Sequence, residues 1–321
     1  MTGANYTLVT GGAGFIGSHL VERLIADGQS VVVIDDLSTG SLANLKGLLH
    51  CERLRVLQGK ISECGELAVL VAGASCIYHL AAAVGVDLVV NSPVRVLQTN
   101  LHETEILLDL ASARGVPLLF TSTSEVYGKS MKEEFSEEDD LLIGPPHFGR
   151  WSYACSKLMD EFLAQAYMRE RGWPAIVARL FNTVGPRQTG QYGMVLPRFI
   201  AAAKAGRPLR VFGDGRQTRC FCYVSDTVEA LVRLQNCPAA RGGTFNAGGT
   251  EEISILELAK LVIDILHSRS TVEFVPYDEA YRPGFEDMLR RKPAVEKLQH
   301  VTGFRPRIVL REIIQRTARE T

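Results

Sequence analysis

The start of the chain combines three features in a fixed order: a strand-like run, a glycine-rich turn and an amphipathic helix. Residues 6–12, YTLVTGG, are mostly β-branched and apolar, and residues 15–28, FIGSHLVERLIADG, carry apolar residues at helical spacing. Between these runs, Gly11, Gly14 and Gly17 recur at every third position. Glycine permits a tight turn and lets backbone N–H groups approach a pyrophosphate at the helix N-terminus. The order of strand, loop and helix therefore predicts a dinucleotide-binding unit, whereas the glycines alone would indicate only a turn.

Short apolar runs alternate with amphipathic helical windows through the first half of the chain. The predicted strands are SVVVIDD, SCIYHLAAA, PLLFTSTS and PAIVARLFN, and two long helices are predicted over residues 96–115 and 153–172. This alternation predicts an α/β fold: a Rossmann-type, doubly wound parallel sheet with helices on both faces. From about Gly185 the pattern becomes irregular. We expect a smaller, discontinuous substrate-binding domain there, built from several returning segments.

An acidic residue closes the second predicted strand, about 20 residues after the glycine turn. Asp35 lies at the carboxyl end of that strand, where a carboxylate can accept hydrogen bonds from both hydroxyls of an adenosine ribose. Its charge would repel a 2′-phosphate, so Asp35 favours NAD over NADP as the cofactor. We interpret the adjacent Asp36 as a loop or capping residue.

Composition and charge argue against several classes of protein. The 321 residues carry a formal net charge of −1 and no basic stripe, so nucleic acid is not an expected partner. No apolar stretch reaches the roughly 18 residues of a membrane span, and the N-terminus lacks a secretory signal pattern. The seven cysteines contain no CxxC pair and no metal-ligand spacing. We expect reduced thiols, no metal site and a cytoplasmic location.

Tyr153 and Lys157 are four residues apart in the motif YACSK, within a predicted helix. This spacing places both side chains on one helix face. A phenol with a pKa of about 10 is a poor base at neutral pH, but a neighbouring ammonium and a nicotinamide cation would favour the phenolate. The two residues are therefore the candidate catalytic base and its partner. A surface tyrosine–lysine pair is the alternative that the spacing alone leaves open.

Six separated motifs follow one another along the chain: TGGAGFIG, HLAAA, TSTSEVYG, YACSK, RLFNTVGPR and FGDGRQTRCFCYVSD. In this order they resemble the extended short-chain dehydrogenase/reductases that act on nucleotide sugars. The resemblance implies NAD as the cofactor, a UDP-sugar as the substrate, and a catalytic set of Thr123, Tyr153 and Lys157. The cofactor-binding residues that it implies are Gly11, Gly14, Phe15, Ile16, Gly17, Asp35, Leu80, Ala81, Ala82, Tyr153 and Lys157. Lys60, in QGKIS, departs from the family, which usually carries an aspartate near the adenine.

The resemblance also divides the chain into two domains. Residues 1–180 with about 221–250 are expected to form the NAD-binding domain, and residues 181–220 and 251–321 the sugar-nucleotide-binding domain. Family members usually pair through two helices per subunit, which implies a homodimer. The corresponding segments here are around 100–114 and 152–170, although core packing would explain their apolar stripes equally well.

The segment after the catalytic threonine distinguishes the reactions of this family. In these enzymes NAD first oxidises a sugar C4 hydroxyl, and the ketone can lead to 4-epimerisation, dehydration or decarboxylation. The dehydratases carry Asp-Glu after the threonine, and Ser124 replaces the first acid here, which disfavours dehydration. TSEVYG resembles the UDP-glucuronate decarboxylases, whose matching glutamate, here Glu125, lies beside the sugar ring. Their Arg-Lys-Pro motif matches RRKP and implies that Arg291 lies near the C5–C6 end of the sugar.

Three alternatives to this interpretation remain. GFEDM, just before RRKP, also occurs in sugar-nucleotide enzymes described only as epimerases, so a UDP-hexose or UDP-hexuronate 4-epimerase is the second candidate. Glu125 could instead be a loop carboxylate that caps a helix. A catalytically silent NAD-binding protein would be expected to lose Tyr153 or Lys157, and both are present.

The resemblance assigns the contacts with the nucleotide to the second half of the chain. Asn182 and Arg219 are expected to bind the diphosphate, with Arg187 nearby. Arginine suits this task because its planar fork bonds two oxygens at once. GMVLPRF and LRVFGDG resemble the segments that sandwich uracil. The substrate-binding candidates are Ser124, Asn182, Val195, Arg210, Phe212 and Arg219.

Overall fold

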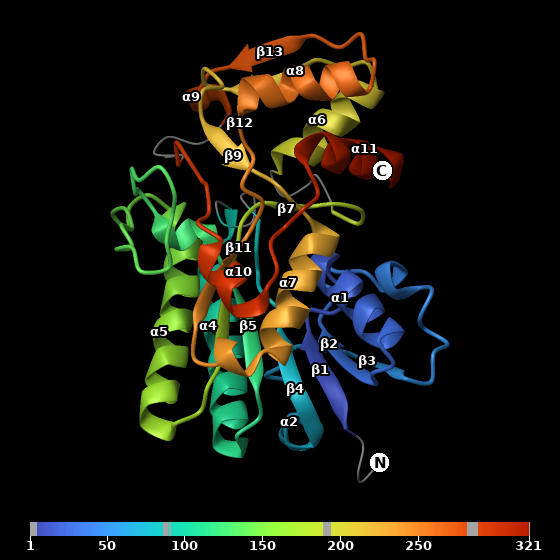
Figure 1. The fold of residues 1–321 in the computed structure, drawn as a ribbon, viewed down its shortest axis with the longest axis vertical. Helices are drawn as coiled ribbons and strands as arrows, with labels where there is room; N and C mark the ends of the chain where they lie inside the picture. Colours follow the sequence, from blue (N-terminus) through green and yellow to red (C-terminus); the bar gives the residue numbers. More distant parts are fainter. Residues whose placement is uncertain (1–4, 86–88, 90, 189–193, 281–287, 321) are drawn as a thin grey trace.

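The fold is organised around one parallel sheet of seven strands, in the order β11-β6-β5-β4-β1-β2-β3 (Figure 1). The structure is a computed structural model that describes residues 5–85, 89, 91–188, 194–280 and 288–320. The strands are β1 (Tyr6–Thr10), β2 (Val31–Asp35), β3 (Leu54–Gln58), β4 (Ala74–His79), β5 (Leu118–Thr123), β6 (Ile176–Leu180) and β11 (Thr244–Ala247). The strand order reverses between β1 and β4, which is where doubly wound sheets bind ligands.

Helices cover both faces of this sheet. The helices on one face are α1 (Phe15–Ala26) and α7 (Val224–Asn236), and those on the other are α2 (Leu67–Gly73), α4 (Pro93–Arg114) and α5 (Trp151–Arg171). The alternation of side chains along β2 explains both layers. Val31 and Val33 pack in the hydrophobic cluster that contains α1 and α7, and Val32 and Ile34 pack in the cluster that contains α2 and α4. The predicted Rossmann-type, doubly wound sheet is confirmed.

The two long predicted helices are present with nearly the predicted ends. The first begins at Pro93, three residues before the predicted start, and the second begins at Trp151. Each ends in a glycine in the left-handed conformation, with φ of 67° at Gly115 and 63° at Gly172. Glycine adopts this conformation without the steric cost of a Cβ, which explains why both helices stop there.

The remaining elements gather above the carboxyl ends of the strands and around their edges (Figure 1). In the upper part, β8 pairs with β13 in parallel and β9 pairs with β12 in antiparallel orientation. The helices and strands outside the sheet layers are η1 (Leu42–Leu45), η2 (Ser124–Tyr127), β7 (Thr183–Val184), α6 (Val195–Lys204), β8 (Leu209–Phe212), β9 (Thr218–Cys220), β10 (Cys222–Tyr223), η4 (Pro238–Ala240), β12 (Glu252–Ser254), α8 (Ile255–Ile265), β13 (Val272–Val275), α9 (Tyr277–Ala280), α10 (Glu296–Thr302) and α11 (Leu310–Glu320).

One hydrophobic cluster runs from the sheet into this upper part. It joins Leu20 of α1 and Leu231 of α7 to Phe199 of α6, Leu258 of α8 and Ile313 of α11. The division of the chain at residues 180, 220 and 250 therefore stays a prediction. Residues 284–287 of the GFEDM segment lie outside the described residues.

Three general expectations concern the chain as a whole. All seven cysteines are free thiols. No helix in the described part of the chain is long and apolar enough to cross a membrane. Within that same part, no group of three or more His, Cys, Asp or Glu side chains is arranged to hold a metal ion.

Candidate active site

Two cavities share a wall at the carboxyl ends of the strands. The first, of about 310 Å³, is lined by the loops that follow β1, β4, β5 and β6, and the second, of about 740 Å³, lies between η2, α6, β8 and β9. Tyr153 lines both cavities. A reaction between a ligand in the first cavity and a ligand in the second would therefore take place beside this phenol.

The glycine turn forms the floor of the first cavity, and its backbone leaves no space for side chains. Gly11 has a φ of 74°, and a Cβ there would lie 2.6 Å from the backbone nitrogen of Ala81. A Cβ on Gly17 would lie 2.0 Å from the carbonyl oxygen of Gly11. A ligand can therefore approach the backbone N–H groups at the first turn of α1. Such donors suit the pyrophosphate of a dinucleotide.

Asp35 lies at the edge of the same cavity, at the end of β2. Its side chain accepts hydrogen bonds from the backbone N–H groups of Ala13 and Leu37, both at 2.8 Å. Burial raises the pKa of the Asp35 carboxyl, and these two hydrogen bonds oppose the increase. Because each carboxylate oxygen can accept more than one hydrogen bond, both ribose hydroxyls can still be bound.

Most of the predicted cofactor-binding residues line this first cavity. They are Gly11, Gly14, Phe15, Ile16, Gly17, Asp35, Leu80, Ala81, Ala82 and Tyr153. Lys60 also lines it, and its ammonium pairs with Glu63 at 2.9 Å, at the surface. Lys157 lines neither cavity, because its side chain is buried behind Tyr153 and is only 2% exposed.

Thr123 and Tyr153 meet where the two cavities join. Thr123 ends β5 and forms a hydrogen bond with the Tyr153 phenol, which lowers the pKa of that phenol. Burial and the charge of Glu125 act in the opposite direction and are stronger, so the net shift of the Tyr153 pKa is upward. Burial of the phenol and then the charge of Glu125 thus oppose the expected preference for phenolate, and Asp160, 2.9 Å from the Lys157 ammonium, contributes in the same direction.

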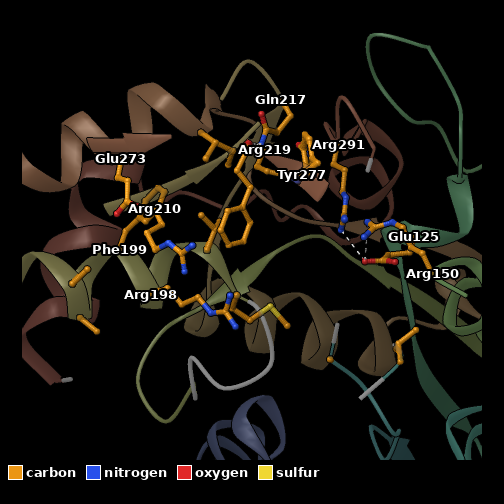
Figure 2. A pocket seen from close by; sticks show the side chains of 18 of the residues that line it. Glu125, Arg150, Arg198, Phe199, Arg210, Gln217, Arg219, Glu273, Tyr277 and Arg291 are labelled. Carbon is orange, nitrogen blue, oxygen red and sulfur yellow. Dashed lines mark hydrogen bonds and ion pairs between the residues drawn. The ribbon is translucent and has the colours of Figure 1, made fainter. Parts of the chain in front are cut away.

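Glu125 lies between two arginines at one end of the second cavity (Figure 2). Its Oε1 is 3.2 Å from Nη1 of Arg291 and 3.7 Å from Nη2 of Arg150. All three side chains are at most 18% exposed, so solvent screens these charges only weakly. Ser124, in contrast, is buried in η2 and lines neither cavity.

The residues that were predicted to hold the nucleotide also line the second cavity: Val195 of α6, Arg210 and Phe212 of β8 and Arg219 of β9. Figure 2 shows Arg210 at the end opposite Glu125, and Arg219 between the two. Arg219 is 7% exposed, and its Nη1 donates to the carbonyl oxygen of Thr218 at 2.7 Å. The cluster of cations here suits a diphosphate.

Two of the candidates for the diphosphate lie elsewhere. Asn182 lines the first cavity, and its amide donates to the carbonyl oxygen of Cys220 at 2.9 Å. Arg187 also lines the first cavity, where it donates to Ser18 at 3.0 Å and pairs with Glu22 at 2.6 Å. Both residues thus line the cavity that is expected to hold the cofactor, and neither is among the residues that line the second cavity.

Sequence reasoning missed several polar residues of the site. Arg150, Arg198 and Arg207 line the second cavity, but nothing in their local sequence distinguishes them from surface arginines. Asn100 is 2% exposed on α4, where its amide bonds both backbone groups of Ala83 and anchors the loop after β4. A polar side chain on the apolar side of a predicted helix could have signalled Asn100.

Comparisons with known proteins agree with this geometry. The model of the NAD dependent epimerase/dehydratase family matches residues 7–248. A UDP-N-acetyl-alpha-D-glucosaminuronate decarboxylase from Bacillus cytotoxicus is 39% identical over 96% of this chain and 96% of its own length. The UDP-glucuronic acid decarboxylase 1 of Arabidopsis thaliana is 38% identical over 96% of this chain and 68% of its own.

A solved structure extends the agreement to the whole fold. The UDP-N-acetylglucosamine 4-epimerase from Methanobrevibacter ruminantium, solved with UDP-N-acetylmuramic acid, is 28% identical and has a TM-score of 0.89. The match covers 99% of this chain and 98% of that one. The glycine turn, the Tyr153–Lys157 pair and these comparisons lead to one conclusion: the chain belongs to the NAD dependent epimerase/dehydratase family, as an extended short-chain dehydrogenase/reductase with NAD as its cofactor.

Proposed function

We propose that this enzyme decarboxylates a UDP-linked hexuronate, with transient oxidation of the sugar at C4. The observation that carries the proposal is Glu125 held between Arg150 and Arg291, at the end of the second cavity that Tyr153 lines. Two arginines beside the reacting end of a sugar suit a substrate with a carboxylate at C6. The relatives at 39% and 38% identity support the same class of reaction.

Some residues of the site transfer or bind the proton, and others act on the substrate through their charge. Tyr153 takes the proton of the C4 hydroxyl, and Thr123 hydrogen-bonds the same oxygen. When bound, NAD would supply the acceptor for the C4 hydride and the source of its return. A ketone at C4 is beta to the C6 carboxylate, so carbon dioxide can leave with its bonding electrons remaining on C5 and the C4 oxygen.

Glu125 and Arg291 then act on the charge of the substrate. The negative charge of Glu125 destabilises the C6 carboxylate and favours its loss as neutral carbon dioxide. Arg291 stabilises the resulting enolate, and uptake of a proton at C5 gives the 4-keto pentose. Return of the hydride to C4 and of the Tyr153 proton to the C4 oxygen then gives the pentose. The remaining proposed roles are cofactor binding by the residues of the first cavity and nucleotide binding by Val195, Arg210, Phe212 and Arg219.

Parallel incubations with UDP-glucuronate and with UDP-N-acetylglucosaminuronate test the proposal. We expect release of carbon dioxide from at least one of them, measured with a ¹³C label at C6, and a UDP-pentose product by mass spectrometry. UDP-glucose, which has no carboxylate, is the matched control. An unchanged mass with inversion at C4 would instead identify the enzyme as a 4-epimerase.

The proposal also includes the homodimer expected from the sequence. Support comes from three large apolar side chains that are more than half exposed: Val94 on α4, and Met159 and Phe162 on α5. Light scattering should give the mass of a dimer for the parent protein and a monomer for Phe162→Asp. A monomeric parent protein would contradict the assignment. The cytoplasmic location stays a prediction.

A further inference from the structure

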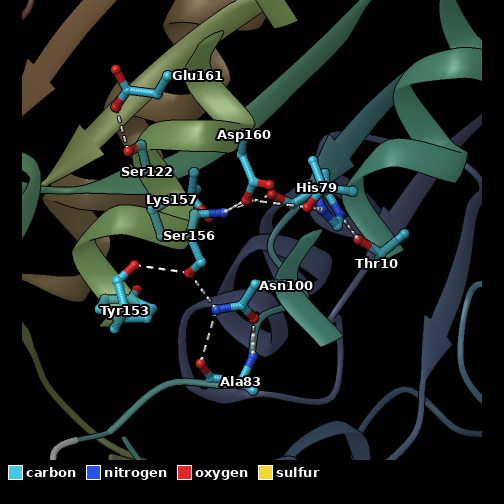
Figure 3. Close-up of polar contacts among 12 residues, drawn as sticks. Thr10, His79, Ala83, Asn100, Ser122, Tyr153, Ser156, Lys157, Asp160 and Glu161 are labelled. Atoms are coloured by element: carbon cyan, nitrogen blue, oxygen red, sulfur yellow. Dashed lines mark hydrogen bonds and ion pairs between the residues drawn. The ribbon is translucent and has the colours of Figure 1, made fainter. Parts of the chain in front are cut away.

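A buried carboxylate lies behind the catalytic pair and has no role in the reaction as proposed. Asp160 follows Lys157 by three residues on α5, and the two side chains are 0% and 2% exposed. The Lys157 ammonium donates to Oδ2 of Asp160 at 2.9 Å (Figure 3). Lys157 is thus held from the side opposite the cavities.

Asp160 also ends a chain of hydrogen bonds that runs from the ends of β1 and β4 to α4 and α5. The hydroxyl of Thr104, on α4, donates to Oδ2 at 3.3 Å and lies 3.0 Å from Nε2 of His79. Nδ1 of His79, at the end of β4, is 2.7 Å from the hydroxyl of Thr10, at the end of β1. The carboxylate can only accept, so Thr104 donates to Asp160, His79 donates to Thr104, and Thr10 donates to His79.

Lys157 is the only cation in this chain of hydrogen bonds. Burial, followed by the charge of Lys157, lowers the pKa of His79 to about 3, so the imidazole is neutral at physiological pH. Asp160 is therefore the counter-charge for the ammonium. A single buried charge is far more costly than a buried pair, so loss of the carboxylate would change how Lys157 is held and what charge surrounds it.

The neighbouring ion pair on the same helix has a different purpose. Glu161 accepts three hydrogen bonds from Arg179 of β6 and one from Ser122 of β5, and this joins the helix to the sheet. Asp160 instead bonds the lysine once, and its Oδ1 has no hydrogen-bond partner among the described residues. Lys157 therefore keeps two N–H groups for other acceptors.

We propose that Asp160 is a positioning residue for proton transfer at Tyr153 and acts through Lys157. The inference rests on the proposed function, in which the Tyr153 phenol takes the C4 proton. Tyr153 precedes Lys157 by one helical turn, so the net charge of the Lys157–Asp160 pair acts on the phenol. With Asp160 present, the ammonium holds a fixed position without adding a full positive charge beside Tyr153.

The other charged groups around Tyr153 determine whether loss of the Asp160 charge raises or lowers the pKa of Tyr153. Glu125 of η2 raises the pKa of the Tyr153 phenol, and Asp160 contributes in the same direction. Arg150, Arg198 and Arg291 line the same cavity as Tyr153, and Arg150 and Arg291 offset the charge of Glu125. Glu103 on α4 lines the first cavity, and Glu161 on α5 and Arg179 on β6 neutralise each other. Removal of the Asp160 charge leaves Lys157 uncompensated and should lower the pKa of Tyr153.

Asp160→Asn, which keeps the size of the side chain, tests the proposal, with Asp160→Ala as a second variant if the first does not fold. The phenolate absorbance of the NAD complex is titrated against pH, and the curve of Tyr153→Phe is subtracted to isolate Tyr153. We expect the midpoint to fall by about one unit, a tenfold change in proton affinity. The acid limb of the pH profile of turnover should move in the same direction.

Glu161→Gln is the matched control, because it removes a buried carboxylate from the same helix without touching Lys157. It should reduce stability and leave the Tyr153 titration in place. If the Asp160 variants fold, bind NAD and titrate with the midpoint of the parent protein, Asp160 has only a structural role and the proposal is wrong. The titration needs no sugar, so it is independent of whether carbon dioxide is released from a hexuronate.

Discussion

The two cavities that meet at Tyr153 are built in different ways. The cofactor cavity is shaped mainly by backbone and small side chains, such as Gly11, Gly17 and Ala81. The sugar-nucleotide cavity is lined by charged side chains from distant segments, such as Glu125 and Arg291. The backbone of the glycine cradle (Gly11, Gly14 and Gly17) therefore shapes the site for the dinucleotide, with Asp35 as its selective charge, whereas side-chain charges dominate the second cavity. A substrate can thus change through a few side chains while the glycine cradle stays the same.

The largest effect is expected at Tyr153, which lines both cavities. Tyr153→Phe removes the proton acceptor, and turnover should fall by about 10²–10⁴-fold, the usual contribution of general acid–base catalysis. The affinity for NAD, measured by calorimetry, should change little because the glycine cradle of the cofactor cavity is intact. Turnover at the parent rate would refute Tyr153 as the base.

A methyl group at Gly17 should weaken binding in the cofactor cavity and leave binding in the sugar-nucleotide cavity unchanged. Gly17→Ala puts a Cβ 2.0 Å from the Gly11 carbonyl oxygen, and the backbone must move to accept it. Strain of about 3 kcal/mol corresponds to roughly a hundredfold loss of NAD affinity. UDP binding should persist.

Gly47→Ala provides the control for this change. A Cβ at Gly47 would meet no atom within 4 Å, so we expect the NAD affinity of the parent protein. Equal NAD affinity in Gly17→Ala and Gly47→Ala would show that the tight cradle does not determine cofactor binding.

The second cavity should respond to the loss of one charge. Arg219→Ala removes a nearly buried guanidinium, and the affinity for UDP should fall by about 10- to 100-fold, as expected for charge-assisted hydrogen bonds of about 1.5–3 kcal/mol. Arg216→Ala is the control, because the Arg216 side chain is 89% exposed and pairs only loosely with Asp214, at 3.6 Å. An identical UDP affinity for both variants would place the diphosphate elsewhere.

The smallest effect is expected at Lys60, which lines the cofactor cavity at the position where the family usually carries an aspartate near the adenine. Its exposed pair with Glu63 is screened by solvent, so Lys60→Ala should alter NAD affinity by no more than about threefold. Fluorescence titration with NAD would measure this. A loss as large as that of Gly17→Ala would mean that charge contributes to cofactor selection as well.

Local patterns in the sequence were sufficient to predict the features that neighbouring residues along the chain determine. The glycine turn, the end of β2 at Asp35 and the two long helices were predicted because each depends on a few consecutive residues. Strands β3 and β11 were not singled out. β3 is an edge strand with only half-buried and exposed residues, and β11 has just four residues, so neither carries a strong apolar pattern.

Charged residues of the site were harder to predict, because their role depends on what the fold brings beside them. Glu125, Arg150 and Arg291 are separated by up to 166 positions in the sequence, yet they meet within 4 Å. Arg187 was expected near the diphosphate but pairs with Glu22 on α1. An arginine looks the same in a sequence whether it faces solvent, a carboxylate or a phosphate.

Sequence alone was enough for five of the seven sheet strands, the glycine cradle and the pair of Tyr153 and Lys157, since hydrophobic periodicity and glycine act over short distances. Tertiary structure alone decided the environment of that pair: a buried Asp160 behind the lysine, and Glu125 between two arginines in front of the phenol. Burial and the distances between charges determine proton affinities, and both exist only once the chain has folded.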